Sequence, residues 1–347
     1  MWLVSLRDLQ FRARRFVIAI LVTALVFGIA LSIDSLRRTI DDETPAIVAV
    51  FGADQWLVAD GASGPFTTTH VLGSETVDDV RALPGVQQAD AVVLSRTVIL
   101  TDPRKDANLI GHEIGGLGSP PISEGRAITA PGEAVVTKGV DVKVGDPLVV
   151  GGSTLQVVGT TPEGRYFFGV PSVFTSLQDA QKIVFAGQPF AMGIAVKGST
   201  TAPAGTTSVT NAQVEADLER PLASGVQSIV VMATLMWLIA AGIIGLIIYL
   251  SAVERTRDFA VLKATGAPSR IVVGGLMIQA VLLALVAAIL SLGTSRIVAT
   301  TMPIPTSITG AAFLELVGIS IVVGVLASLA GVRAALGTDP ALAFGGR

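Results

Sequence analysis

The chain has 347 residues, of which 51% are hydrophobic and 15% charged, and its mean hydropathy is +0.68. Soluble domains carry about 25% charged residues, so this balance argues against an ordinary cytosolic enzyme, and the apolar content excludes disorder for most of the chain. There is no cysteine and there are two histidines, so disulfides and thiolate metal sites are excluded and a histidine-rich metal site is disfavoured. We expect no catalytic, cofactor-binding or metal-binding residue in this chain.

The first 33 residues predict a basic amphipathic helix followed by a membrane anchor. In residues 1–15, apolar side chains recur at helical spacing between four arginines, a pattern typical of a helix at the cytoplasmic membrane surface. Residues 16–33 are 18 residues without a charge, close to the ~20 that span a bilayer, and predict transmembrane helix 1. A cleaved secretory signal is the alternative. Its apolar core would be longer than the ~7–15 residues usual in signals, so we favour an uncleaved anchor.

The long segment 34–222 predicts an extracytoplasmic mixed α+β domain. It holds 189 residues, enough to bury a core of its own. β-Branched residues cluster between glycine and aspartate turns, which is typical of short strands. On this pattern we predict strands at 46–50, 92–100, 134–137, 147–150 and 155–160.

Two short helices and two helical stalks complete the predicted domain. The helices are expected at 74–83, with its first residue, a serine, as the N-cap, and at 176–184. A helical pattern continues transmembrane helix 1 outward through 35–43. A second one leads through 211–228 into the next apolar run, where Pro221 is expected to bend the chain. Helical stalks on both sides would carry motion of the domain into the membrane.

The remainder of the chain predicts three further transmembrane helices joined by short segments. Buried core helices of a large soluble protein are the alternative, and such long uncharged runs make it the weaker one. In chain order we predict transmembrane helix 2 at 223–251, a cytoplasmic loop at 252–270, transmembrane helix 3 at 271–296, an outer loop at 297–309, transmembrane helix 4 at 310–332 and a cytoplasmic tail at 333–347.

The charges predict the orientation in the membrane. Residues 1–15, 251–270 and 332–347 together hold 10 Lys/Arg and 4 Asp/Glu, whereas residues 34–222 hold 13 Lys/Arg and 22 Asp/Glu. Because cytoplasmic segments carry an excess of lysine and arginine, both termini are predicted to be cytoplasmic and the long acidic segment to lie outside. We expect a multi-pass protein of a bacterial plasma membrane.

Residues 254–267, between transmembrane helices 2 and 3, carry the most specific pattern of the chain. Two adjacent apolar residues give the segment an apolar face, its basic residues can donate to carboxylates of a partner, and its glycine can end a short helix. The plain alternative is a basic turn that obeys the same charge rule. The residues expected to couple this chain to a partner are Glu254, Arg255, Arg257, Phe259, Val261, Leu262, Lys263, Gly266 and Ala267.

This loop resembles the loop between the second and third spans of ABC-transporter permeases of the MacB/FtsX/LolC type. The sequence 132–136 followed by 144–146, and the tail 339–343, are also similar to that family. The resemblance implies an α-helical four-span transmembrane domain with an extracytoplasmic mixed α+β domain between spans 1 and 2. It also implies an ABC ATPase subunit pressed against the loop, a second permease copy or a homologous permease, and membrane lipid as partners. Nucleic acid is not expected as a partner.

The energy source is expected to lie on another chain. None of the six lysines follows a glycine, so the phosphate-binding loop G-x-x-x-x-G-K-[ST] cannot be written anywhere in the sequence. If ATP drives this protein, ATP and Mg²⁺ bind a separate ATPase subunit, and this chain is not an enzyme by itself.

The resemblance implies mechanotransmission, in which ATP-driven closure moves the outer domain and a hydrophobic or amphipathic substrate is exported. The alternative is an FtsX-like regulator that activates an extracytoplasmic partner such as a cell-wall hydrolase. A membrane-anchored enzyme is a third possibility. His70 and His112 are available to it, but their spacing matches no nucleophile motif.

Two features of the spans complete the predicted sites. Arg296 and Glu315 flank the outer loop, and a charge so close to the membrane suggests an ion pair, although each side chain can also reach the interface alone. Small residues at helical spacing let helices approach closely, or are simply tolerated there. Those predicted to pack are Ala241, Gly245, Ser320, Gly324 and Ser328.

Overall fold

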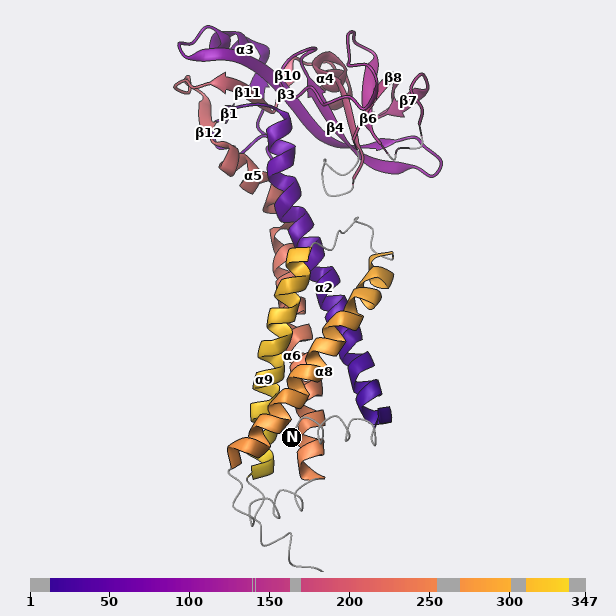
Figure 1. Cartoon of the computed structure of the whole chain (residues 1–347). Coiled ribbons are helices and arrows are strands. Elements are labelled where there is room, and N and C mark those ends of the chain that lie inside the picture. The colour runs from indigo at the N-terminus through magenta and orange to yellow at the C-terminus, as the bar shows by residue number, and fades with distance from the viewer. Residues whose placement is uncertain are drawn as a thin grey trace, which may run out of the picture. The chain divides into compact units, whose positions relative to one another are not determined.

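The chain folds into two compact units, each joined to the other by helical segments of the chain (Figure 1). The helical unit comprises residues up to Arg38 and from Gly225 onward, and the α/β unit comprises Thr39–Ser224. A computed structural model describes residues 13–138, 140, 142–162, 170–254, 269–300 and 310–336.

The described part of the helical unit consists of four long helices. They are α2 (Ala13–Val50), which continues into the α/β unit, α6 (Ala223–Val253), α8 (Ser269–Ala299) and α9 (Gly310–Leu336). At ~1.5 Å per residue, the 31 residues of α6 or α8 extend about 46 Å, more than a ~30 Å hydrocarbon core.

Three helical stretches in the described part of the chain are long and apolar enough to cross a membrane. They are Phe16–Val50, Asn211–Val253 and Gly274–Ala299, and a shorter apolar helix covers Gly310–Leu326. This confirms a membrane helical domain. A fourth span stays a prediction, because the described apolar part of α9 is shorter than the other three.

The core of the helical unit consists largely of small side chains. Alanines of α2, α6 and α8 are fully buried against Phe27, Leu31 and Ile244, and Phe27 stacks on Trp237 with ring centroids 5.4 Å apart. Large apolar side chains instead cover the outer faces, with Leu238 and Leu314 63% and 71% exposed. Soluble proteins do not expose apolar surface on this scale, so these faces suit a lipid environment.

The α/β unit is organised around a ten-stranded sheet with strand order β12-β1-β11-β3-β4-β9-β6-β8-β5, and β7 pairs with β3 and β8. Strands β2 (Leu72–Gly73) and β10 (Phe190–Ala191) form a separate pair. The strands of the large sheet are β1 (Gln55–Ala59), β3 (Val86–Ile99), β4 (Lys105–His112), β5 (Glu124–Gly125), β6 (Glu133–Thr137), β7 (Pro147–Val150), β8 (Ser153–Thr161), β9 (Ser172–Ser176), β11 (Gly193–Gly198) and β12 (Thr206–Val209).

Short helices accompany this sheet. They are α3 (Ser74–Arg81), α4 (Leu177–Phe185), α5 (Asn211–Glu219) and the 3-10 helix η2 (Arg220–Leu222). Both predicted short helices are confirmed, but the N-cap of α3 is Gly73, without a side-chain cap, and not the serine after it. Side-chain caps are found instead on α4, where Ser176 accepts the Asp179 N–H, and on α5, where Thr210 and Gln213 form a capping box.

The predicted strand at 46–50 is wrong, because α2 continues as a helix to Val50. Its last turn buries Ile47 and Val48, and Val48 and the next residue after the helix, Phe51, join the core around Trp56 in the α/β unit. Packing of these side chains outweighs the β propensity of the valines and isoleucine. The four other predicted strands are confirmed, and η2 interrupts the second helical connection at Pro221 as expected.

Candidate functional site

The predicted coupling loop joins the end of α6 to the start of α8. Glu254 follows the last residue of α6, is exposed, and donates its backbone N–H to the Leu250 carbonyl oxygen at 3.1 Å. The other eight predicted coupling residues lie outside the described residues, so their role stays a prediction. They are Arg255, Arg257, Phe259, Val261, Leu262, Lys263, Gly266 and Ala267.

Glu315 has a different partner from the one expected. Its carboxylate is bound by Arg38 of α2, and the same guanidinium donates through Nε to Asp34 Oδ2 at 2.7 Å. No ion pair joins Arg296 to Glu315 in the described part of the chain. The physical reason is that α2 extends beyond the apolar run, which brings Asp34 and Arg38, one turn apart, within reach of α9. The i, i+4 spacing of Asp34 and Arg38 was the feature of the sequence that could have predicted their ion pair.

The small residues of α9 lie where two helices meet. A methyl group built on Gly324 would lie 3.2 Å from Val281 Cα and 3.3 Å from the Ala280 carbonyl oxygen, so α9 rests on the backbone of α8 at this point. Ser320 is fully buried and donates its hydroxyl to the Val317 carbonyl oxygen at 2.8 Å. The side chain of Ser328 lies outside the described residues.

The second predicted packing pair, on α6, is less enclosed. Ala241 is partly buried and packs against the core of the helical unit, and Gly245 is half-buried. A close approach between α2 and α8 was not predicted from the sequence. There Thr294 donates its hydroxyl to the Ala24 carbonyl oxygen at 3.0 Å, and a methyl on Gly28 would lie 2.9 Å from Thr294 Cβ.

Within the α/β unit, the sequence similar to the permease family at 132–136 contains a carboxylate that holds a turn. Glu133 accepts hydrogen bonds from Arg126 and from the backbone N–H of Thr129 at 2.8 Å and of Ala130 at 3.3 Å. The Arg126 guanidinium is the main reason that the pKa of Glu133 is lowered to about 2, and the two backbone N–H groups contribute. Glu133 therefore has a structural role.

The two histidines lie in different environments. His112 is buried on β4, its Nδ1 lies 2.8 Å from the Glu113 carbonyl oxygen, and burial lowers its pKa. His70 lies exposed in the loop after β1. In the residues that the structure describes, no group of three or more His, Asp or Glu side chains is placed to hold a metal ion.

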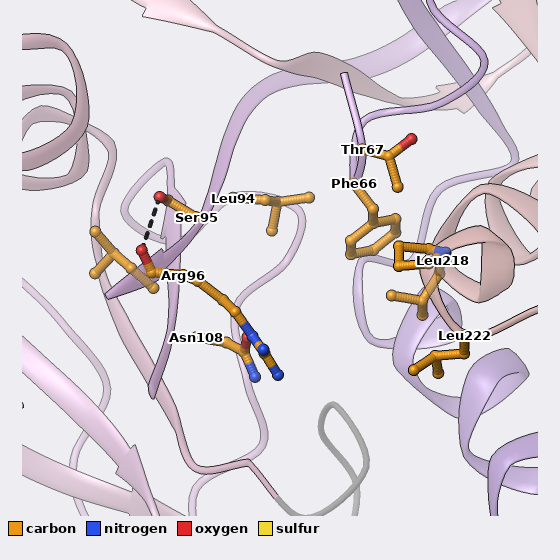
Figure 2. A pocket seen from close by; sticks show the side chains of 10 residues that line it. Phe66, Thr67, Leu94, Ser95, Arg96, Asn108, Leu218 and Leu222 are labelled. Atoms are coloured by element: carbon orange, nitrogen blue, oxygen red, sulfur yellow. Dashed lines mark hydrogen bonds between the residues drawn. The ribbon is translucent and has the colours of Figure 1, made fainter. Parts of the chain in front are cut away.

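A cavity of about 250 Å³ in the α/β unit was not predicted (Figure 2). On one side, Arg96 of β3 and Asn108 of β4 stand at paired positions of neighbouring antiparallel strands. On the other side lie apolar side chains from the loop after β1, from α5 and from η2. The lining residues are Phe66, Thr67, Leu94, Ser95, Arg96, Asn108, Leu109, Leu218, Pro221 and Leu222.

One buried carboxylate fixes the loop that forms a wall of this cavity. Asp217 of α5 is fully buried, and its Oδ2 accepts the backbone N–H groups of Phe66 at 2.9 Å and Thr67 at 3.1 Å. Its Oδ1 accepts the hydroxyl groups of Ser63 and Thr67. Gly64 leaves room for this approach, because a methyl there would lie 2.5 Å from Asp217 Cβ. Asp217 thereby fixes Phe66 at the cavity.

Sequence comparison assigns both parts of the chain to known families. Residues 17–220 match the MacB-like periplasmic core domain, and residues 230–340 match the C-terminal part of FtsX-like permeases. Two ABC transporter permeases, Mb2592 of Mycobacterium bovis and Rv2563 of Mycobacterium tuberculosis, are each 38% identical over 344 residues, which is 99% of both chains. A further permease of M. tuberculosis, Rv0072, is 35% identical over the same length.

Two solved structures show a weaker similarity. The extracellular domain of the transporter YknZ from Gram-positive bacteria is 15% identical, with a TM-score of 0.34, and the match covers 42% of this chain and 83% of that one. The periplasmic region of MacB from Actinobacillus actinomycetemcomitans is 11% identical, with a TM-score of 0.37, covering 48% and 94%.

Long apolar helices with outward apolar faces and a separate α/β unit define a multi-pass membrane protein. Because its relatives match over nearly the full length, the chain belongs to the ABC transporter permeases, with a MacB-like periplasmic core domain and an FtsX-like C-terminal part. This confirms the resemblance to the MacB/FtsX type of permease. Membership of this family implies an ATPase partner and a bacterial membrane.

Proposed function

We propose that this chain is the permease subunit of an ABC transporter whose ATP and Mg²⁺ are bound by a separate ATPase chain. ATP hydrolysis there moves the α/β unit outside the membrane, and this motion exports a hydrophobic or amphipathic substrate. The permease works as a pair, with a second copy or a homologous chain. Four spans with both termini in the cytoplasm place the loop between α6 and α8 on the side of the ATPase.

The observation that carries this proposal is that both connections between the two units are helical. Helix α2 is one helix from Ala13 to Val50, with Pro45 inside it beyond the boundary at Arg38, and α6 begins at Ala223, just before the other boundary at Gly225. A helix resists stretching because each turn is closed by backbone hydrogen bonds. Displacement of the spans is therefore passed to the α/β unit instead of being absorbed by a flexible linker.

The composition of the spans favours transmission of motion and argues against a polar pore. The runs 16–33, 223–253 and 271–295 contain no charged residue. Asp34, Arg37 and Arg38 follow the apolar run of α2, and Glu315 of α9 is bound to Arg38. The core between the helices is lined by alanine, leucine and isoleucine. In the described residues such a core provides no charged pathway for a polar substrate.

Co-purification with the ATPase tests the proposal. The full chain is purified in detergent with candidate ATPase subunits, as wild type and as a Val261→Asp/Leu262→Asp double variant. We expect the wild type to retain an ATPase and the variant to lose it, because two charges replace the apolar face of the loop. A Thr256→Asp/Thr265→Asp variant, which adds the same charge to the same loop, is the matched control and should retain it. If wild-type protein retains no ATPase, the proposal is wrong.

A further inference from the structure

The cavity of the α/β unit combines an exposed arginine with an apolar wall. Arg96 is exposed at its mouth, and in the part of the chain that the structure describes its guanidinium has no carboxylate partner. Its side chain extends from β3 beside that of Asn108 on β4, so that their nitrogen-bearing ends lie together (Figure 2). A guanidinium has five N–H donors in a planar fork that matches a carboxylate.

Asn108 adds a buried donor that its own fold does not satisfy. The residue is 6% exposed, and among the described residues no atom accepts a hydrogen bond from its Nδ2. An unsatisfied buried polar group costs free energy, so such groups are rare unless a ligand or another role accounts for them. The amide therefore points to an acceptor that comes from outside the protein.

The opposite wall is mostly apolar and suits a hydrocarbon chain, and the hydroxyl of Thr67, which also lines it, donates to Asp217. Phe66, Leu218 and Leu222 face Arg96 and Asn108 across the cavity (Figure 2), and Leu94 and Pro221 extend the apolar lining. Binding sites with an apolar lining and a few converging donors are typical of small ligands, at about 300–1,000 Å³ for drug-sized molecules. The cavity volume of about 250 Å³ suits a smaller amphiphile.

We propose that this cavity binds a single-chain amphiphile with a carboxylate head group. The carboxylate accepts hydrogen bonds from Arg96 and Asn108, and the hydrocarbon chain lies against Phe66, Leu218 and Leu222. Asp217 is a positioning residue, since it fixes the loop that carries Phe66. As a substrate site, this assignment rests on the proposed export function, whereas binding itself needs no ATPase.

Photolabelling of the full chain tests the proposal directly. The probe is decanoate with a diazirine near the end of its chain, added to purified protein in a nonionic detergent without ATPase, and the labelled peptides are identified by mass spectrometry. We expect label on the peptides that contain Phe66 and residues 218–222. Free decanoate should compete, and decanol, which has the same chain without the charge, should not.

Substitutions separate a binding role from a structural one. Arg96→Gln should reduce labelling about tenfold or more, because a charge-assisted hydrogen bond is lost. Arg104→Gln, which removes the same charge from an exposed turn outside the cavity, should leave it unchanged. Asn108→Leu should also reduce labelling, while its unfolding temperature stays equal to the wild type or rises, because an unsatisfied buried amide is removed.

Three results would overturn the assignment: equal labelling of the Arg96→Gln and Arg104→Gln variants, equal competition by decanol, or label that is absent from the cavity peptides. A lowered unfolding temperature in Asn108→Leu would show that the amide serves the fold instead of a ligand. Since no ATPase is present, failure of this test leaves the co-purification result untouched, and failure of co-purification leaves the labelling result untouched.

Discussion

At the scale of single residues, carboxylates in the α/β unit hold turns that the backbone alone would leave open. Glu133 does so beside Arg126, which is the main cause of its lowered pKa, and Asp217 does so by accepting four hydrogen bonds in a buried position. Removing either carboxylate leaves backbone or hydroxyl donors without their acceptor, which is the costly kind of loss.

From the lowered pKa of Glu133 we predict that the folded protein loses stability in acid. Its pKa of about 2 in the folded protein lies below its ordinary value, so the unfolded chain binds more protons between these two pH values. The stabilisation is complete above the ordinary pKa of ~4.3 and is lost as the pH falls towards 2. Because the Arg126 side chain is largely exposed, we expect no more than about 1 kcal/mol. Thermal unfolding at pH 7 and pH 3 checks this: Glu133→Gln should lose less stability than the wild type, and equal losses would contradict it.

For Asp217 we predict a larger loss of stability, which does not depend on its charge alone. In Asp217→Asn the new NH₂ group faces donors that now lack an acceptor, so the free energy of unfolding should fall by about 2 kcal/mol. Asp106→Asn, at an exposed position of β4, is the matched control and should change it by less than about 0.5 kcal/mol. Thermal unfolding of both variants measures the difference. Equal stability of the two would show that the loop from Ser63 to Thr67 is held by other contacts.

At the scale of elements, the long helices could be predicted from the sequence, but the elements that pack against them could not. Uncharged runs such as 16–33 and 271–295 exclude a water-exposed position by composition alone, whereas the five residues at 46–50 fit a strand and a helix equally well by local pattern. Packing of Val48 and Phe51 in the core of the α/β unit favours the helix. Strand β4 was not predicted, so the pairing of Arg96 with Asn108, and with it the cavity, stayed out of reach.

Ion pairs between elements show the same limit. The spacing of Asp34 and Arg38 is local and could be predicted, but Glu315 is 277 residues away from Arg38 in the chain. Which of two arginines meets it depends on how far α2 extends and how α9 packs, and neither is encoded in a short pattern.

The approach of α9 to α8 at Gly324 can be tested with a matched pair of glycines. Gly324→Leu forces a side chain against Val281 Cα, so the stability of the helical unit should fall by about 1–3 kcal/mol. Gly318 lies on the same helix, and a methyl built there would meet nothing within 4 Å. Gly318→Leu should therefore have little effect on thermal unfolding in detergent. If both variants unfold at the same temperature, close packing at Gly324 does not hold the two helices together.

At the scale of the whole molecule, the proposed function depends on the helical connections between the two units. In the proposed mechanism the ATPase acts on the helical unit and the α/β unit handles the cargo, so free energy passes along the chain between them. A continuous α2 and a helical path through α5, η2 and α6 supply two such routes. A flexible linker in either place would separate hydrolysis from motion.

The distance between the two units during ATP hydrolysis tests this account most directly. Because the chain has no cysteine, spin labels can be placed at Gln87→Cys in the α/β unit and at exposed Ile297→Cys in the helical unit without other changes. In complex with its ATPase, the distance distribution between the labels should shift when ATP replaces ADP, and replacing residues 39–42 of α2 with glycine should remove the shift while hydrolysis continues. An unchanged distribution in wild-type protein that hydrolyses ATP would contradict the account.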